Sequence, residues 1–287
     1  MGKMRNEVIT IKFIKRLIRS GVKLNRLLML FSYVVICFCL VILAIFRPFD
    51  VKKVQAKKTV PQEISKKTTI TKKTYTIEDL KAENYPAELI DFAQKYPETM
   101  QFVIDYKKDA IKYNSQPISI KGEVKKGTVP LFIQWDKRWG YRKYAGGFFA
   151  TRTCGPTCMS MVYAGITGKS DQNPYKMAQW SYKNGYYKDG QGTSWIYLYH
   201  AAKTLGLHEM DIRNSPATIK DYLKHGYILI ANVKKGDFTK SGHYIVIRGL
   251  DKNGKLLIND PNSRNNSRKT WDITRVSKQI KLLGAFK

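Results

Sequence analysis

The order of sequence patterns along the C-terminal two thirds of the chain predicts an α+β domain, with helices packed on an antiparallel sheet. Apolar residues first recur at three- and four-residue steps in 84–96, 98–112 and 154–166, which is the spacing of helices with one buried face. Three short runs rich in Ile, Val and Leu then follow, at 227–233, 243–250 and 255–260. Helices that precede the strands, rather than alternate with them, are typical of α+β folds.

Start and stop signals define the remaining helices of this domain. Thr167-Gly168 ends the helix 154–166, and Pro174 stands in the first turn of the next one. Further helices are expected from Thr193 to Gly206 and from Ser215 to Gly226. Asn253-Gly254 separates the last two strand-like runs and predicts a tight hairpin turn between them.

Residues 27–46 (LLMLFSYVVICFCLVILAIF) form a run of 20 residues without a charge. At about 1.5 Å per residue, a helix of this length crosses a hydrocarbon core of about 30 Å. The run ends at Phe46-Arg47-Pro48, without the small-x-small cleavage site of a secretory signal. We therefore expect an uncleaved transmembrane signal anchor, and a cleaved signal peptide is the alternative.

The flanks of this run indicate the orientation of the chain. Residues 1–26 carry eight Lys or Arg residues, which assigns them to the cytoplasm by the positive-inside rule. The far flank is also basic, so the orientation rests partly on this run being the first span. On this basis we expect a single-pass protein of the cell membrane with an extracellular C-terminal domain.

The rest of the chain divides into a linker, a lead-in and a main domain. Residues 47–81 are rich in Lys, Thr, Val and Gln and keep no helical or strand period, which is typical of a basic, flexible linker. Residues 82–127 contain two short amphipathic helices and form a helical lead-in. Residues 128–287 form the main domain, which begins with an extended apolar segment, VPLFIQW (129–135).

The chain is strongly basic, because 51 Lys and Arg against 22 Asp and Glu give a formal net charge of +29. The charge is spread along the chain, with +13 in residues 1–81 and +16 in residues 82–287. Such a protein favours polyanionic surroundings, so anionic lipid headgroups and anionic cell-wall polymers are candidate partners. No segment combines a basic face with interleaved aromatic residues, and a nucleic-acid partner is not expected.

The cysteines and histidines predict neither a metal site nor another cofactor. Cysteines occur only at positions 37, 39, 154 and 158, without a CxxC or metal-finger spacing. The four histidines form no HExxH pattern. Two cysteines are too few to build the main domain around disulfides, and with the abundant lysine this suggests the surface of a Gram-positive bacterium.

Cys154 is the candidate nucleophile because it opens the predicted helix 154–166. The N-terminus of a helix offers free N–H groups and the positive end of the helix dipole, which lower the pKa of a thiol. Pro156 supports a helix start here, since a residue of the first turn needs no N–H donor. Cys158 lies one turn further on and is expected to be a small, buried apolar residue.

His243 and Asp260 flank the predicted hairpin and are the candidate base and its orienting carboxylate. They are 17 residues apart, and two strands of about seven residues joined by a tight turn return the chain to its starting end. We therefore expect both side chains at the same open end of the hairpin. There Asp260 can hold one tautomer of His243 and stabilise its cation, and His243 can act as the base for Cys154.

Five motifs follow one another between residues 129 and 262. They are VPLFIQWDKRWG (129–140), TCGPTCMSMVYAGITG (153–168), GQGTSW (190–195), SGHYIVIRG (241–249) and INDPN (258–262). In this order they resemble the C39-like branch of the papain-like cysteine peptidases. The resemblance implies a papain-like peptidase fold and a thiol hydrolase acting on a peptide or protein substrate, with Cys154 as nucleophile, His243 as base and Asp260 as the orienting residue.

The resemblance also implies that a Gln side chain donates to the oxyanion, and Gln134 occupies the matching position before Trp135. Gln134 lies 20 residues upstream of Cys154, whereas relatives that cleave bacteriocin leaders have their Gln much closer. A structural role for Gln134 in a loop is the alternative. The backbone N–H of Cys154 can supply one oxyanion donor in either case.

Two other functions fit the same residues. A cell-wall amidase or acyltransferase would use the same triad on a different bond, and a non-catalytic surface module would keep the fold as a binding groove. A catalytic protein requires an unusually reactive Cys154, whereas a binding module predicts ordinary thiol chemistry. The tryptophans are expected to be packing residues, except that Trp195 in GQGTSW is a candidate wall of a substrate groove.

Overall fold

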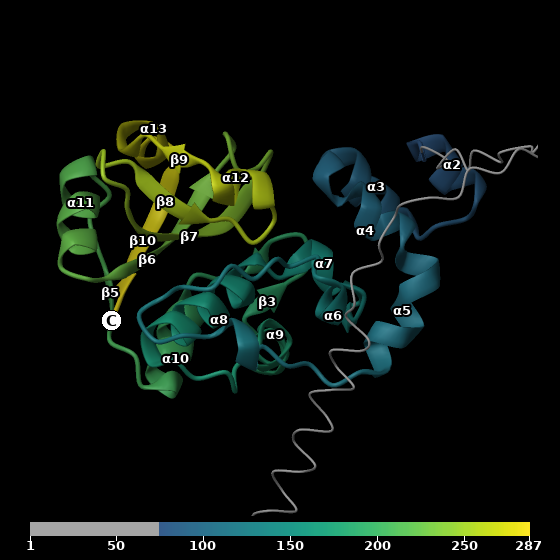
Figure 1. The fold of residues 1–287 in the computed structure, drawn as a ribbon, viewed down its shortest axis with the longest axis horizontal. Coiled ribbons are helices and arrows are strands. Elements are labelled where there is room, and N and C mark those ends of the chain that lie inside the picture. The colour runs from purple at the N-terminus through teal and green to yellow at the C-terminus, as the bar shows by residue number, and fades with distance from the viewer. Residues whose placement is uncertain (1–74) are drawn as a thin grey trace, which may run out of the picture. The chain divides into compact units, whose positions relative to one another are not determined.

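A computed structural model describes residues 75–287 of the chain. The predicted basic segment (1–26) and anchor (27–46) lie outside these residues, as does most of the predicted linker (47–81). No helix within the described part has the length and apolar character needed to cross a membrane. This part combines helices with a six-stranded antiparallel sheet, so the predicted α+β class is confirmed (Figure 1).

The first helix, α2 (Ile77–Ala82), begins earlier than the predicted lead-in. Thr76 and Asp79 form a capping box at its N-terminus, and Leu80 is fully buried. The predicted linker therefore differs from the structure at its C-terminal end. The capping residues were present in the sequence, but a helix of six residues is too short to show a period.

The lead-in continues with α3 (Ala87–Lys95), a 3₁₀ turn (Pro97–Thr99), α4 (Met100–Ile104) and α5 (Tyr106–Ser115). Pro97 interrupts the helices, as predicted, because it stands at the first position of the 3₁₀ turn. The predicted single helix 98–112 is instead divided at Asp105 into α4 and α5.

The lead-in helices are docked on the main domain through apolar and polar contacts. The rings of Phe102 and Tyr141 stack with centroids 4.3 Å apart, and the Tyr141 hydroxyl donates to the Phe102 carbonyl at 2.7 Å. On α3, the Glu88 carboxylate accepts a hydrogen bond from Arg152 Nε at 2.9 Å. These contacts make the lead-in and the main domain share one buried cluster of residues.

The chain between the lead-in and the main helices folds as a series of short elements. Residues 129–135 carry no regular secondary structure, although Phe132 and Ile133 are buried. The elements are a 3₁₀ turn (Lys121–Glu123), α6 (Lys137–Gly140), β1 (Lys143–Tyr144), β2 (Gly147–Phe148) and α7 (Phe149–Arg152). The aromatic, Gly-rich stretch 138–149 therefore contains a small β1–β2 hairpin.

The main helices agree with the prediction to within a few residues. They are α8 (Cys154–Thr167), α9 (Pro174–Lys183), α10 (Ile196–Leu205) and α11 (Pro216–Lys224). Ser215 caps α11, and Gly168 and Gly206 end α8 and α10 with positive φ, as those glycines predicted. A two-stranded hairpin, β3 (Tyr187–Lys188) and β4 (Gly192–Thr193), precedes α10.

The large sheet has the strand order β5-β10-β6-β7-β8-β9. Its strands are β5 (Glu209–Asp211), β6 (Ile228–Lys234), β7 (Gly242–Leu250), β8 (Leu256–Asn259), β9 (Thr270–Trp271) and β10 (Ile280–Phe286). The three predicted strands are β6, β7 and β8, and the turn at Asn253-Gly254 joins β7 to β8. The prediction missed β5, β9 and β10, and with them the place of β10 between β5 and β6.

Both faces of this sheet are covered, as Figure 1 shows. Ile230 and Val246 pack with α8 and α10 on one face, while Ile245 and Ile247 pack with α11 and α13 (Ile273–Ser277) on the other. Alternate residues of β7 thus enter different clusters, as the two-residue period of a strand requires. The remaining short helix, α12 (Arg264–Arg268), contacts β8.

We expect Phe102→Ala to lower the free energy of unfolding by about 3–5 kcal/mol, because Phe102 is 3% exposed and its ring stacks on Tyr141. The matched control is Ile111→Ala on α5, which should change it by less than about 0.5 kcal/mol, because Ile111 is 84% exposed. Urea unfolding followed by tryptophan fluorescence measures both. Equal effects of the two substitutions would contradict the docking of the lead-in described above.

Candidate active site

Cys154 is the first residue of α8, where the sequence predicted a helix start. Its side chain is partly exposed, and the backbone N–H groups of Tyr244 and Gly155 contribute to lowering its pKa. Position 155 is closely packed, because a Cβ there would lie 3.1 Å from the Cβ of Thr193. The sulfur is therefore held between the tip of α8 and strand β7.

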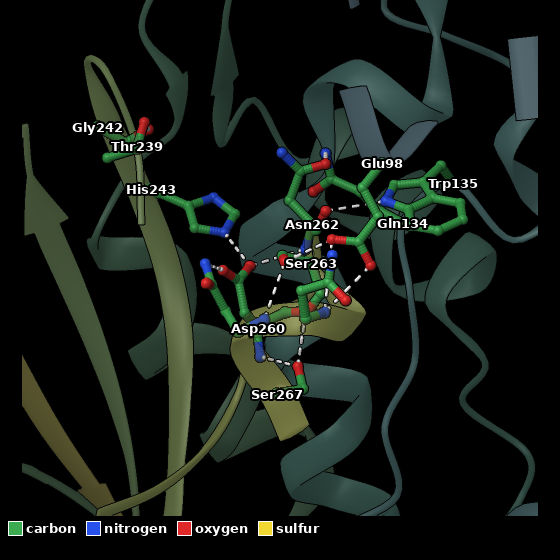
Figure 2. A network of polar contacts seen from close by, with 12 residues as sticks. Glu98, Gln134, Trp135, Thr239, Gly242, His243, Asp260, Asn262, Ser263 and Ser267 are labelled. Atoms are coloured by element: carbon green, nitrogen blue, oxygen red, sulfur yellow. Dashed lines mark hydrogen bonds and ion pairs between the residues drawn. The ribbon is translucent and has the colours of Figure 1, made fainter. Parts of the chain in front are cut away.

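His243 lies near the start of β7 and is buried. Its Nε2 lies 2.8 Å from Asp260 Oδ1, and Figure 2 shows this contact. The Cys154 side chain and the His243 ring also interact, since each shifts the pKa of the other. Because Asp260 occupies Nε2, the ring nitrogen left for Cys154 is Nδ1. The structure thus brings Asp260, His243 and Cys154 into one site.

The charges in this chain favour a thiolate beside an imidazolium. Burial by itself lowers the pKa of His243, but the Asp260 carboxylate and the hydrogen bond to Cys154 outweigh it and raise the pKa to about 10. Loss of hydration by itself raises the pKa of Cys154, but the hydrogen bond and charge of His243 lower it below its usual range. Both shifts favour the ion pair of a Cys154 thiolate and a His243 imidazolium over the neutral pair.

Cys158 provides a contrast within the same helix. It is fully buried, as predicted, and burial raises the pKa of its thiol well above the usual range. Cys154 and Cys158 are one helical turn apart, yet only Cys154 lies against a positive partner. Their difference comes from the surroundings and not from the residue type.

Asp260 follows β8 directly and is fully buried. Besides His243, its Oδ1 accepts a hydrogen bond from the Asn262 N–H at 2.8 Å, and its Oδ2 accepts one from Asn266 Nδ2 at 2.9 Å. These donors fix the orientation of the carboxylate. The sequence analysis did not identify Asn266, whose only signal was its position six residues after Asp260, in a polar turn.

Gln134 lies beside the turn that carries Asp260. Its Nε2 donates to the Ala150 carbonyl at 2.6 Å and to Asn262 Oδ1 at 3.2 Å, and its backbone N–H donates to the Pro261 carbonyl at 2.7 Å. Its Oε1 is buried without a hydrogen-bond partner among the described residues. No hydrogen bond within 75–287 joins Gln134 to Cys154, so its role as an oxyanion donor stays a prediction.

The structure explains the unusual spacing between Gln134 and Cys154. The intervening residues form α6, the β1–β2 hairpin and α7, and the Phe149 N–H donates to the Arg142 carbonyl at 2.8 Å to close this loop. The chain therefore returns to Gln134 at Ala150, four residues before Cys154. A long separation in sequence becomes a short one in space.

Two tryptophans contact the turn and the strand that carry this site. Trp135 Nε1 donates to the Asn262 carbonyl at 2.9 Å, which adds a hydrogen bond to those that Gln134 makes with the turn after β8 (Figure 2). Trp195 stacks on Tyr244, the residue after His243, with ring centroids 6.0 Å apart. Trp195 therefore packs on the strand that carries His243, and its role as a wall of a substrate groove stays a prediction. Trp135 contributes more than the packing role predicted for it.

Within residues 75–287, no group of three or more His, Cys, Asp or Glu side chains is arranged to hold a metal ion. The chemistry available from the described residues is that of a thiolate, an imidazolium and a buried carboxylate.

Comparison with solved structures finds peptidase domains of bacterial transporters. The peptidase domain of Streptococcus ComA, a bifunctional ABC transporter involved in quorum sensing, is 28% identical over 47% of this chain and 90% of that chain, with a TM-score of 0.34. A double glycine motif protease from an AMS/PCAT transporter, solved with its leader peptide, is 17% identical over 60% of this chain and 99% of that chain, with a TM-score of 0.34. No curated protein matches the chain.

The family comparison covers the whole segment that holds the candidate residues. The family described as the Peptidase_C39 like family matches residues 126–282, which is more than half of the chain. The match begins before Gln134 and ends within β10, so it includes the helices, the sheet and the Cys154, His243 and Asp260 positions. On this match the protein belongs to the Peptidase_C39 like family, a family of cysteine peptidase type.

Proposed function

We propose that this protein is an extracellular cysteine peptidase, anchored in the cell membrane by residues 27–46, that cleaves peptide bonds with Cys154, His243 and Asp260. The observation that carries the catalytic proposal is the buried 2.8 Å contact between His243 and Asp260, together with the effect of His243 on the pKa of Cys154, which it lowers. The membrane proposal rests on the uncharged run of residues 27–46 and the basic segment before it.

The proposed reaction begins when the Cys154 thiolate attacks the carbonyl carbon of the substrate. The carbonyl oxygen becomes an oxyanion, and the Cys154 N–H at the start of α8 donates to it. His243 then transfers its Nδ1 proton to the leaving nitrogen as the C–N bond breaks, which leaves an acyl group on the sulfur. A water molecule attacks this thioester while His243 removes its proton, and the thiolate is restored as the acid product leaves.

Gln134 and Asp260 have supporting roles in this proposal. Asp260 holds the His243 ring with Nδ1 toward the sulfur and stabilises the imidazolium before proton transfer. Gln134 can add a second oxyanion donor if its Nε2 exchanges the bond to Ala150 or to Asn262 for one to the substrate. Its Oε1 has no hydrogen-bond partner among the described residues, so the hydrogen-bonding capacity of the Gln134 amide is not fully used.

The lowered pKa of Cys154 is the feature that separates a peptidase from a binding module with the same fold. We expect iodoacetamide to label Cys154 at neutral pH at least about tenfold faster in the wild type than in His243→Ala, because that substitution removes the positive partner of the thiolate. Cys158 should remain unlabelled in the folded protein. Mass spectrometry of the alkylated peptides gives both rates, and equal rates in the two proteins would favour the binding module.

Substitutions at Cys154, at Asp260 and at its hydrogen-bond donor Asn266 should lower the rate of cleavage by different amounts. On a mixture of internally quenched peptides, Cys154→Ala should abolish cleavage, and Asp260→Asn should lower kcat/KM by roughly two to four orders of magnitude, because His243 loses its orienting partner. Asn266→Ala should have a smaller effect in the same direction, since Asp260 keeps its other donors. Asn114→Ala, which removes an exposed amide on α5 that makes no side-chain hydrogen bond within the described residues, is the control. Mass analysis of the products identifies the bond, and unchanged cleavage by Cys154→Ala would exclude the proposed mechanism.

The pH dependence of cleavage should be bell-shaped. Activity requires Cys154 ionised, so it falls in acid as pH drops below the lowered pKa of the thiol. It also requires His243 protonated, so it falls in base as pH rises through about 10. The rate of alkylation by iodoacetamide should fall only in acid and not in base, because the thiolate persists when His243 is neutral. Identical profiles for cleavage and alkylation would contradict the acid role of His243.

Membrane anchoring is tested by fractionation of cells that express the full chain. We expect the protein to stay with the membranes in high salt and in alkaline carbonate and to be released by detergent, because a hydrophobic span resists both washes. A variant that lacks residues 1–46 should appear in the soluble fraction. Release of the full chain by high salt alone would indicate that its net charge of +29, and not an anchor, holds it at the surface.

A further inference from the structure

A pocket of about 420 Å³ lies beside Asp260, at the junction of the lead-in and the main domain. Lys95–Glu98 from the end of α3 form one wall, and Gly236–Lys240 between β6 and β7 form another. The turn after β8 completes it with Asn262, Ser263, Asn265 and Asn266. Several of these residues appear around His243 and Asp260 in Figure 2.

Tyr96 connects this pocket to the reactive centre. It lines the pocket together with Asp260 and with Thr239 of the other wall. Burial raises the pKa of Tyr96, and the charges of Cys154 and Asp260 raise it further. The family match begins only at residue 126, and Tyr96 is thus an addition of this chain's lead-in to the site.

The walls of the pocket are held in place by hydrogen bonds that link the lead-in to the Asp260 turn. The Glu98 carboxylate accepts from Ser263 Oγ at 2.6 Å and from the Asn265 N–H at 3.1 Å (Figure 2). The ring of Tyr96 packs edge-on against Phe92 of α3, with centroids 5.5 Å apart. The pocket is therefore formed before a ligand enters, which reduces the entropy lost on binding.

The groups at this pocket that lack an ion pair carry a net positive charge, because two lysines stand against one carboxylate. Asp237 pairs with Arg275 and Asp260 pairs with His243, while Glu98 accepts hydrogen bonds from Ser263 and the Asn265 N–H and keeps its charge. Lys95 and Lys240 are exposed and have no ion pair among the described residues, and Lys95 Nζ lies 5.6 Å from the centre of the Tyr96 ring. Two ammonium groups without an ion pair, beside the polar side chains that line the pocket, can bind a carboxylate through charge-assisted hydrogen bonds.

We propose that this pocket is a substrate subsite that binds a peptide carboxylate beside the reactive centre, with Lys95, Tyr96 and Lys240 determining the specificity. The carboxylate can come from an Asp or Glu side chain or from the C-terminus of the peptide. The subsite rests on the proposed peptidase function for its purpose, but binding itself does not require Cys154 to react. A binding experiment therefore separates the two proposals.

The test uses the full-length Cys154→Ala protein, which binds without cleaving, and fluorescein-labelled peptides that differ in one group. One pair carries an internal Glu or Gln with an amidated C-terminus, and a second pair carries Gln with a free or amidated C-terminus. Fluorescence anisotropy gives each Kd. The carboxylate member of at least one pair should bind about three- to tenfold more tightly, and the pair that shows it identifies the source.

Matched charge variants are essential, because a chain of net charge +29 attracts any acidic peptide. In Lys95→Ala/Lys240→Ala the preference should disappear, and in Lys95→Glu/Lys240→Glu it should reverse toward a Lys-containing peptide. The control Lys203→Ala/Lys255→Ala removes two exposed lysines outside the pocket and should keep the preference. All four lysines are exposed, so folding should be retained, as thermal unfolding can verify.

Two results would overturn the subsite. One is equal affinity for both members of both peptide pairs, and the other is an equal loss of preference in the pocket and control variants. Neither result depends on catalysis. Conversely, slow alkylation of Cys154 together with a preference that needs Lys95 and Lys240 would keep the pocket as a binding site and reject the peptidase.

Discussion

The contact between His243 and Asp260 is the constraint on which the rest of the site depends. Both side chains are buried, and a buried ion pair loses roughly 3–5 kcal/mol when one partner is removed. Such a pair is tolerated only when further hydrogen bonds replace lost water, and Asn262 and Asn266 supply them to the carboxylate. The low pKa of Cys154 follows from the charge of His243, which in turn follows from Asp260.

The turn after β8 is held by segments that are distant in sequence. Gln134 and Trp135 bind it from the segment before α6, and Glu98 binds it from the 3₁₀ turn of the lead-in. The lead-in is thus a structural part of the site. The lead-in, which precedes the segment that matches the family, therefore shapes the surface around Asp260.

The sequence predicted those features that local rules control. A helix start at Cys154, the turn at Asn253-Gly254 and the period of β6 and β7 each depend on a few neighbouring residues. The missed features depend on distant partners: β10 is mixed in polarity and becomes a strand by pairing with β5 and β6. Asn266 and Tyr96 likewise gain their roles only through contacts with Asp260 and Thr239, which no local pattern encodes.

The bond between Gln134 and Asn262 joins residues 128 positions apart. Contacts of this range form late in folding, because the entropy of closing a long loop must be overcome first. A chain that is still unfolded therefore carries an ordinary, weakly reactive thiol at position 154. The lowered pKa of Cys154 is therefore a property of the completed tertiary structure and not of the cysteine and its sequence neighbours alone.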